Sequence, residues 1–234
     1  MKTIGVLGGL GPQATMDFEQ RVHQVAQQLA PQRGTGGYPP MLVHYCRHPP
    51  VLSDADLNPI FPLQPDPRMF VAARMLGQVA DFLVITSNGV HFMQAALEEA
   101  AGRPILSMIE ATLAEVARRG WQRVGVLAFQ TPQIYAQALE LRGLQSESVD
   151  ASVQTKLNQV MWAVVEGRAE PWASEVMRSA LETLRARGVD GVILGCTEFP
   201  FVLPDELDAP DIINPIAMLA EAAVRHAMAN SHQP

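Results

Sequence analysis

The chain contains an internal repeat in which a strand, a loop and the start of a helix occur twice. Residues 3–7 (TIGVL) recur 120 positions later as residues 123–127 (RVGVL), and the Pro-Gln pair at 12–13 recurs at 132–133 with the same offset. Such self-similarity limits a chain to folds that are built from like units. We therefore expect two similar halves, each beginning with a buried strand.

A second pair of matching segments locates equivalent strand ends in the two halves. Residues 81–85 (DFLVI) align with residues 190–194 (DGVIL), which lie 109 positions further along. This alignment puts Ser87 opposite Cys196. In open parallel α/β sheets, ligand sites form beyond the carboxyl ends of the strands. The repeat therefore predicts that these two side chains take part in the functional site.

Short β-branched runs alternate with longer helical patterns, which is typical of βαβ units with a mainly parallel sheet. We predict strands at 3–7, 41–45, 82–86, 105–108, 123–128, 191–194 and 211–213. Helical periodicity predicts helices at 14–29, 69–78, 92–100, 110–119, 134–144, 153–165, 173–187 and 217–229. The expected fold class is α/β, with two similar α/β/α domains related by pseudo-twofold symmetry, each with a mainly parallel sheet.

The expected domains are residues 1–103 with 215–234, and residues 104–214, with the active site in the cleft between them. The loops that follow the strands then line this cleft, and they are 8–13, 86–91, 129–133 and 195–199. A proline-rich stretch at 58–68 (NPIFPLQPDPR) predicts a surface loop or lid near the entrance, because proline interrupts regular ladders.

Composition and charge disfavour several classes of protein. Hydrophobic residues make up 48% and charged residues 18% of the chain, as in ordinary globular proteins, which disfavours disorder. The formal net charge of −7, without a basic run, argues against nucleic acid or an anionic membrane as a partner.

The first apolar run breaks into glycines too early for a signal peptide, and no stretch approaches the length of a membrane span. We therefore expect a cytoplasmic protein. Cys46 and Cys196 are the two cysteines, and neither has CxxC or Cys/His ligand spacing around it. We expect no disulfide framework and no metal site.

Cys196 directly follows an apolar strand and precedes Thr197 and Glu198. A thiol at a strand end, near the N-terminus of a helix, can have a lowered pKa and act as a base or nucleophile. The alternative is a buried structural cysteine. We favour the functional interpretation because Ser87 lies opposite it in the repeat.

Ser87, Asn88 and Gly89 follow the third predicted strand. A hydrolase that pairs Ser87 with His91 is disfavoured, because no GxSxG motif surrounds the serine. Ser and Asn are also preferred N-cap residues, and capping is compatible with substrate contact. His91 is expected to pack or hydrogen-bond locally at the start of the helix.

Residues 9–14 (GLGPQA) match GxGxxA, the dinucleotide-binding pattern, between a strand and a helix. However, the second predicted strand ends without an acidic residue for a ribose, and Pro12 lacks a backbone donor. We prefer capture of a small carboxylate by the remaining N–H groups and the helix dipole. Thr131, opposite Gly11 in the repeat, offers either a hydroxyl to the site or an N-cap to the helix.

Three residues gather at the end of the second predicted strand. Arg47 is a candidate for binding a second carboxylate, since a guanidinium matches the geometry of that group. Cys46 is more simply a core residue, and His44 has no firm assignment.

Three motifs together resemble the aspartate/glutamate racemase family: GGLGPQAT near the start, SNGVH after the third strand and GCTEFP after a late strand. The resemblance spans nearly the whole chain. It implies two α/β halves with pseudo-twofold symmetry, a homodimer, no pyridoxal phosphate or other cofactor, no metal, and a small amino acid or carboxylic acid as the ligand.

The resemblance also implies residue roles. In such enzymes a cysteine of each half faces one side of the substrate Cα, so that one thiolate removes the proton and a thiol on the other side returns one. Cys196 matches the second cysteine, and Ser87 replaces the first. Val165 stands where typical aspartate racemases have a lysine. The implied substrate-binding residues are Leu10, Asn88, Gly89, Thr131, Thr197 and Glu198.

The function expected is a cofactor-independent racemase for aspartate, glutamate or a related amino acid, with Cys196 as principal acid/base. One alternative is a single-cysteine, malonate-type decarboxylase, in which one thiol protonates the enolate that remains after CO2 leaves. Another is a degenerate member that binds a carboxylic acid without turnover. A dinucleotide-dependent oxidoreductase is the least favoured reading.

Overall fold

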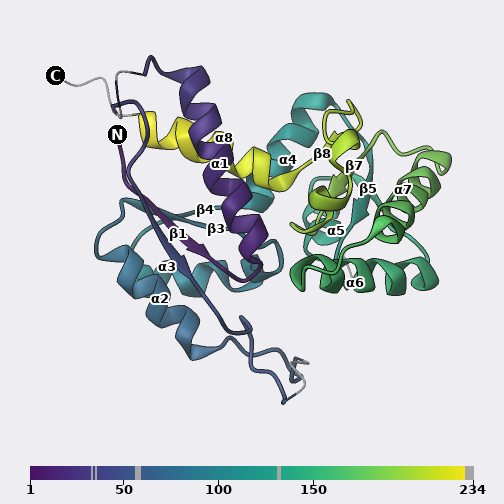
Figure 1. Cartoon of the computed structure of the whole chain (residues 1–234), viewed down its shortest axis with the longest axis horizontal. Coiled ribbons are helices and arrows are strands. Elements are labelled where there is room, and N and C mark those ends of the chain that lie inside the picture. The colour runs from purple at the N-terminus through teal and green to yellow at the C-terminus, as the bar shows by residue number, and fades with distance from the viewer. Residues whose placement is uncertain (33, 35, 56–58, 131–132, 230–234) are drawn as a thin grey trace. The chain divides into compact units, whose positions relative to one another are not determined.

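The computed structural model describes residues 1–234 apart from 33, 35, 56–58, 131–132 and 230–234. The chain divides into two compact units, which we call the first unit (Met1–Met108 and Leu219–Pro234) and the second unit (Ile109–Met218). Each unit contains a four-stranded parallel sheet flanked by helices (Figure 1). The α/β class with parallel sheets, predicted from the sequence, is therefore confirmed.

The sheet of the first unit has the strand order β2-β1-β3-β4. Its strands are β1 (Ile4–Gly8), β2 (Met41–Tyr45), β3 (Phe82–Ile85) and β4 (Ile105–Leu106). The helices are α1 (Pro12–Leu29), α2 (Pro67–Gly77), the 3-10 helix η1 (Gly89–Met93), α3 (Gln94–Ala101) and the later part of α8 (Pro215–Met228). Helices α2 and α3 cover one face of the sheet, and α1 and α8 cover the other (Figure 1).

The sheet of the second unit has the equivalent order β6-β5-β7-β8. Its strands are β5 (Arg123–Leu127), β6 (Gln145–Glu147), β7 (Gly191–Leu194) and β8 (Ile212–Ile213). The helices are α4 (Met108–Arg119), α5 (Gln133–Glu140), α6 (Ala151–Val165), α7 (Pro171–Ala186) and the 3-10 helices η2 (Phe199–Val202) and η3 (Pro204–Glu206). One core cluster joins α6 and α7 to the sheet, and another joins α4 and α5 to its opposite face.

The register of the central strands reproduces the internal repeat. Ile4 pairs with Phe82 in the first unit, and Val124 pairs with Gly191 in the second. The residues of β1 and β5 thus differ by 120 positions, and those of β3 and β7 by 109, as the sequence alignment requires. The repeat therefore describes the same sheet built twice, with matching strand ends.

Six α-helices start two residues earlier than the apolar periodicity predicts. Four of them begin with a proline, namely Pro12, Pro67, Pro171 and Pro215. Proline suits the first turn of a helix, because its missing N–H has no partner there and its φ is already helical. A periodicity count begins only at the first buried side chain, so it misses this turn.

Two sequence predictions near residue 140 are wrong. The helix predicted over 134–144 ends at Glu140, and strand β6 follows at 145–147, where no strand was predicted. Gly143 has a φ of +72°, which breaks the helix between these two elements. Strand β6 is short, polar and at the edge of its sheet, so it lacks the apolar alternation that reveals a strand.

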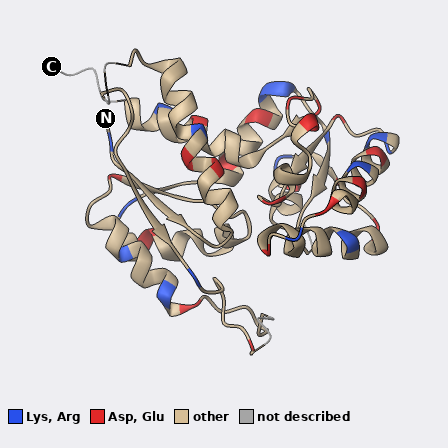
Figure 2. Cartoon of the chain, viewed as in Figure 1, with Lys and Arg blue, Asp and Glu red and all other residues tan. Residues whose placement is uncertain are grey.

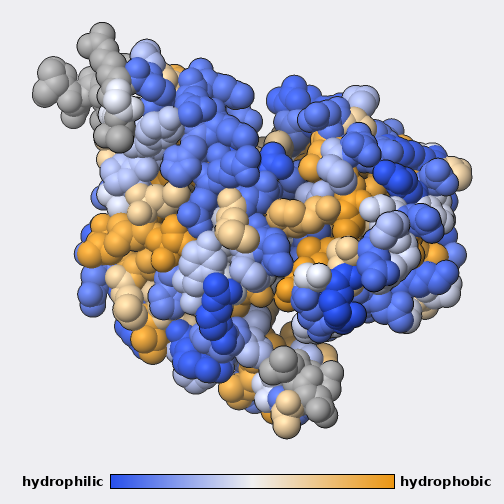
Figure 3. All heavy atoms as spheres, in the orientation of Figure 1, coloured by the Kyte–Doolittle hydropathy of each residue, from blue (hydrophilic) through white to orange (hydrophobic). Residues whose placement is uncertain are grey.

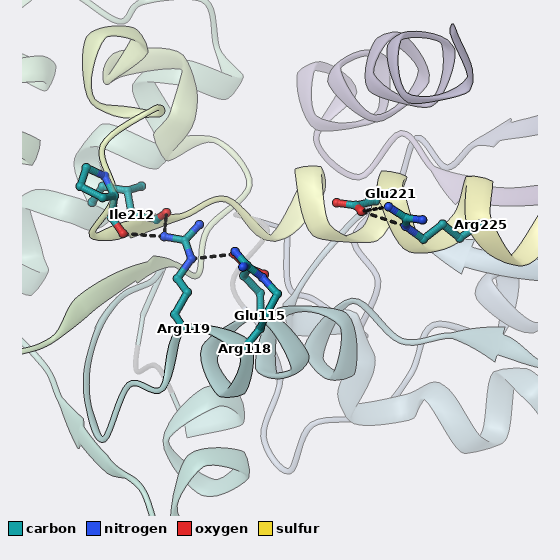
Figure 4. A network of polar contacts seen from close by, with 7 residues as sticks. Glu115, Arg118, Arg119, Ile212, Glu221 and Arg225 are labelled. Atoms are coloured by element: carbon teal, nitrogen blue, oxygen red, sulfur yellow. Dashed lines mark hydrogen bonds and ion pairs between the residues drawn. The ribbon is translucent and has the colours of Figure 1, made fainter. Parts of the chain in front are cut away.

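Arg119 joins α4 to the strand at the other edge of the second sheet (Figure 4). Its Nη1 donates to the carbonyl oxygens of Pro210 (2.7 Å) and Ile212 (3.0 Å), while its Nε donates to Glu115 (2.6 Å). Hydrogen bonds from Arg118 and Arg119 lower the pKa of Glu115 to about 2. This contact fixes β8, whose neighbour β7 leads into Cys196.

Acidic and basic side chains are interspersed over the helices of both units (Figure 2). Patches of apolar residues also lie on the surface (Figure 3). Phe61, Met75 and Leu141 are among the large apolar side chains that are exposed. Among the residues that the structure describes, no helix is both long enough and apolar enough to span a bilayer.

The proline-rich stretch, predicted as a loop over 58–68, is an irregular arm that runs into α2. Isolated antiparallel bridges join Val51 to Pro65 and Ser53 to Pro59, and the arm ends at Asp66, the N-cap of α2. Residues 56–58, which include the first residue of the predicted loop, lie outside the described part of the chain.

Candidate active site

The loop after β1 is held by a buried threonine on the first turns of α1. The Thr15 hydroxyl accepts a hydrogen bond from the Gly9 N–H (2.8 Å) and lies 2.9 Å from the Thr86 hydroxyl at the end of β3. Thr15 thus links the carboxyl ends of the two central strands of the first unit. Thr15 belongs to the glycine-rich motif GGLGPQAT, but no pattern in the sequence indicated its role.

This arrangement bears on how the glycine loop can bind anions. Gly9 has a φ of +77°, and a Cβ at this position would lie 2.5 Å from Tyr45 Cα. The glycine is therefore required where the loop crosses the end of β2. Because the Gly9 N–H is already bonded to Thr15, any anion must use other donors of the loop. Leu10 follows Gly9 and is half-buried against the core of this unit.

Ser87, Asn88 and Gly89 lie at the carboxyl end of β3, as the sequence predicts. Ser87 is half-buried, the Asn88 side chain is buried, and Gly89 is exposed with open space where a Cβ would be. Asn88 occupies the N-cap of η1, but it makes no side-chain capping bond to any residue that the structure describes. Capping therefore does not account for Asn88.

His91 fixes the position of the Ser87 loop. Its Nε2 accepts the N–H of Met108 at the start of α4 (3.1 Å), so Nδ1 carries the proton and donates to the Ser87 carbonyl (2.9 Å). Burial lowers the pKa of His91 to about 4, which keeps the ring neutral at physiological pH. The local hydrogen bonding that was expected of His91 is confirmed, and the contact with Met108 was not foreseen.

In the second unit, Cys196 occupies the position equivalent to Ser87, two residues beyond the last paired residue of β7. The Cys196 thiol donates to Glu198 Oε2 (3.2 Å), and the Thr197 hydroxyl donates to the same oxygen (2.9 Å). All three side chains are at most 7% exposed. The three residues therefore form one buried, hydrogen-bonded group.

The expectation of a lowered thiol pKa at Cys196 is wrong. Burial raises the pKa of Cys196, and the negative charge of Glu198 raises it further. The pKa of Glu198 is also raised, because the carboxyl group is buried. The helix that follows Cys196 is a 3-10 helix of four residues, too short for a strong dipole to offset burial. The resting form is therefore a thiol, poised to donate a proton.

Two backbone donors nevertheless point at the Cys196 sulfur. The N–H groups of Phe129 and Glu198 hydrogen-bond to it, and each of them favours the thiolate. Phe129 follows the carboxyl end of β5, so the loops after β5 and β7 meet at the sulfur. Thr131, the expected hydroxyl of the first of these loops, lies outside the described residues.

The three residues at the end of β2 separate into a core group and a surface group. Cys46 is 1% exposed in the core, and burial raises its pKa to about 11, which confirms the core assignment. Arg47 is exposed, with its guanidinium 4.9 Å from the centre of the Tyr45 ring. His44 is half-buried within β2. Arg47 is thus accessible to a ligand at this strand end.

No three His, Cys, Asp or Glu side chains of the described residues come together in a group able to hold a metal ion.

The fold and the two equivalent strand ends define a class: α/β proteins of two like units, with polar side chains at matching strand ends. The family model described as Asp/Glu/Hydantoin racemase matches residues 7–226. The chain belongs to this family, which confirms the resemblance drawn from its motifs.

The similarity of this chain to known proteins covers nearly its whole length. The chain is 25% identical over 228 residues to the broad specificity amino-acid racemase RacX of Bacillus subtilis, covering 94% of this chain and 96% of RacX. It superposes on an aspartate racemase homologue from Pyrococcus horikoshii with a TM-score of 0.74 at 21% identity, covering 97% and 99% of the two chains. For unliganded arylmalonate decarboxylase the TM-score is 0.51 at 18% identity, covering 98% and 94%.

Proposed function

We propose that the protein is a cofactor-independent amino-acid racemase in which Cys196 is the principal acid/base and Ser87 takes the place of a second one. The proposal rests on the equivalence of Cys196 and Ser87 in a chain of the racemase family. Each side chain lies two residues beyond the last paired residue of a central strand. Racemisation needs one proton-transfer group on each side of Cα. We propose that the strand ends of both units contribute to one site.

The Cys196 group has the parts that proton transfer requires. In the donating direction the thiol gives its proton to the carbanion at Cα, and the thiolate that results accepts the N–H bonds of Phe129 and Glu198. In the abstracting direction the thiol first passes its proton to the Glu198 carboxylate, 3.2 Å away, and the thiolate then takes the Cα proton. Glu198 therefore acts as the proton acceptor for Cys196, which is a more specific role than the substrate binding that the resemblance implies.

Ser87 makes the two proton-transfer steps unequal. A hydroxyl can donate a proton to the opposite side of the carbanion, and the alkoxide left behind is reprotonated from water. As a base it is much weaker than a thiol, because its ordinary pKa is far above that of cysteine. We therefore expect Cα hydrogen exchange to be faster for the enantiomer whose proton faces Cys196, whereas kcat/KM for racemisation is equal from both enantiomers because their equilibrium constant is one.

The substrate carboxylate requires donors near both proton-transfer groups. We propose that it is held by N–H groups of the loop at Leu10 and by the amide of Asn88 beside the small residue Gly89. The Thr131 hydroxyl completes this set, while the Thr197 hydroxyl, which donates to Glu198, can accept a hydrogen bond from the substrate ammonium group. Asn88 and Thr197 stand at equivalent positions in the two halves, like Ser87 and Cys196.

A second function is favoured by one specific observation. The similarity to arylmalonate decarboxylase spans both chains. With Cys196 as a single thiol, the chain could lose CO2 from a malonate-type acid and protonate the enolate that remains. Release of CO2 from a substituted malonate, without hydrogen exchange at Cα of any amino acid, would favour this function over racemisation.

The proposal is tested by hydrogen exchange at Cα in D2O, followed by NMR for both enantiomers of a broad panel of amino acids. The racemase predicts deuterium at Cα, and its loss in Cys196→Ala. Absence of exchange from every amino acid, with intact binding of a carboxylic acid, would leave a protein that binds its ligand without turning it over.

A further inference from the structure

The backbone of Phe129 contacts the proposed acid/base, its ring pairs with that of Trp162, and neither ring has a role in proton transfer. We propose that Phe129 and Trp162 form a subsite for the side chain of the substrate, and that this subsite selects amino acids with large apolar or aromatic side chains over acidic ones. The inference rests on the proposed function, because it concerns the same site.

Phe129 is tied directly to the reacting group. Its backbone N–H hydrogen-bonds to the sulfur of Cys196. A substrate whose Cα proton reaches this sulfur must therefore bring its own side chain close to residue 129. The Phe129 ring is partly buried against the core of the second unit, so its place beside the thiol is fixed by packing.

Trp162 extends this surface from Phe129 along α6. The two ring centroids are 5.9 Å apart with an interplanar angle of 87°, the edge-to-face geometry that aromatic pairs favour. Trp162 is 43% exposed, although tryptophan is usually well covered in a folded chain. The ring thus offers uncovered apolar area beside the residue that contacts the thiol.

The loop that carries Phe129 is held by amide side chains of α6. Gln154 donates to the Ala128 carbonyl (2.8 Å) and to Asn158 Oδ1 (3.0 Å), and Asn158 Oδ1 accepts the Gln130 N–H (2.8 Å). These bonds bracket Phe129 on both sides. A subsite whose geometry is fixed before binding loses less entropy when the ligand enters.

The charge on this helix face also favours a neutral side chain. Asn158, Trp162 and Val165 follow each other at helical spacing, and Val165 packs half-buried against the core. Lys156 is the one charged residue in the sequence of α6, and it lies about 120° around the helix from Trp162, given about 100° per residue. The face beside Phe129 therefore presents amide and apolar groups to a ligand.

The test compares kcat/KM for Cα exchange of phenylalanine, leucine, alanine, aspartate and glutamate by the wild type, Trp162→Ala, Trp162→Phe and Leu141→Ala. Leu141 is an 87% exposed apolar residue of the same unit and serves as the matched control. We expect the wild type to prefer phenylalanine over aspartate by at least about tenfold. Trp162→Ala should lower the value for phenylalanine by about 10- to 100-fold and leave alanine unchanged.

Trp162→Phe should keep most of the wild-type kcat/KM for phenylalanine, and Leu141→Ala should leave kcat/KM unchanged for all five amino acids. A wild type that prefers aspartate or glutamate would overturn the subsite while upholding the racemase. Equal losses for phenylalanine and alanine in Trp162→Ala would overturn it as well, because alanine has no side chain to reach the subsite.

If no amino acid exchanges, the proposed function fails and the subsite is decided by binding. Calorimetric titration with phenylacetate and with acetate then compares the wild type with Trp162→Ala. A preference for phenylacetate that disappears in the variant supports the subsite. Equal affinity of the wild type for the two acids overturns it.

Discussion

The Cys196 thiol donates a hydrogen bond to Glu198 Oε2 over 3.2 Å, and both groups are buried. Because the charge of Glu198 raises the pKa of the thiol, we expect Glu198→Gln to lower that pKa partway toward its usual value. At a fixed pH between 7 and 9, iodoacetamide should therefore label Cys196 faster in Glu198→Gln than in the wild type.

The same variant should be a poorer enzyme, because the amide cannot take up the thiol proton. We expect the exchange rate at Cα to fall by about 10²–10⁴-fold, the usual contribution of a general base. Glu175→Gln serves as the control, since it makes the same change at an exposed residue of the same unit. Faster labelling together with an unchanged exchange rate would show that Glu198 raises the pKa of the Cys196 thiol without accepting its proton.

Ser87→Cys should make Cα exchange of the two enantiomers more alike. A thiol in place of the hydroxyl provides a second usable base on the other side of Cα, so hydrogen exchange of the slower enantiomer should rise toward that of the faster one. NMR in D2O from each pure enantiomer measures both initial exchange rates. If the wild type already exchanges both enantiomers at equal rates, the expected weakness of Ser87 is wrong.

The lowered pKa of His91 predicts that the stability of the protein depends on pH. Its pKa is about 4 in the folded protein and about 6.5 in the unfolded chain, so between these values the unfolded chain binds a proton that the folded protein does not. The contribution of His91 is constant above pH 6.5, and stability falls as the pH drops below it. Between pH 7 and pH 5 the loss from this residue is about 2 kcal/mol.

Urea unfolding of the wild type and His91→Gln at the two pH values checks this prediction. The variant should be less stable at pH 7, because the bonds to Ser87 and Met108 are altered, but it should lose about 2 kcal/mol less between pH 7 and pH 5. His23→Gln, which changes an exposed histidine, should behave like the wild type. The same pH dependence in all three proteins would contradict the account.

Alanine substitutions at Gly9 and Gly143 distinguish the cost of backbone strain from the cost of a steric clash. Both have a positive φ, +77° and +72°, but a Cβ at Gly9 would lie 2.5 Å from Tyr45 Cα, whereas none of the described atoms lies within 4 Å at Gly143. Gly143→Ala should cost about 1 kcal/mol of unfolding free energy. Gly9→Ala should cost at least about 2 kcal/mol more. Equal costs, measured by urea unfolding, would show that the loop after β1 can move aside.

The sequence predicts the sheets well because their strands are buried and repeated. The segments matched by offsets of 120 and 109 residues became the paired central strands of the two units, and this fixed Ser87 and Cys196 as equivalent positions. Strand β6 escaped prediction, because a polar edge strand of three residues leaves no apolar pattern.

Contacts between distant segments could not be predicted in the same way. Position in the sequence favoured a lowered pKa for Cys196, and burial reversed the direction. The contact of His91 with Met108 and the ring pair of Phe129 and Trp162 each join residues that no local pattern connects. The substrate-binding roles, the cleft and the homodimer stay predictions.

The role of Cys196 is tested by deuterium incorporation at Cα in D2O, measured for the wild type, Cys196→Ala and Cys46→Ala. We predict exchange by the wild type, a loss of at least about 10³-fold in Cys196→Ala, and near wild-type exchange in Cys46→Ala wherever that variant folds, because Cys46 is a core residue. Exchange that survives the loss of the Cys196 thiol would contradict this role.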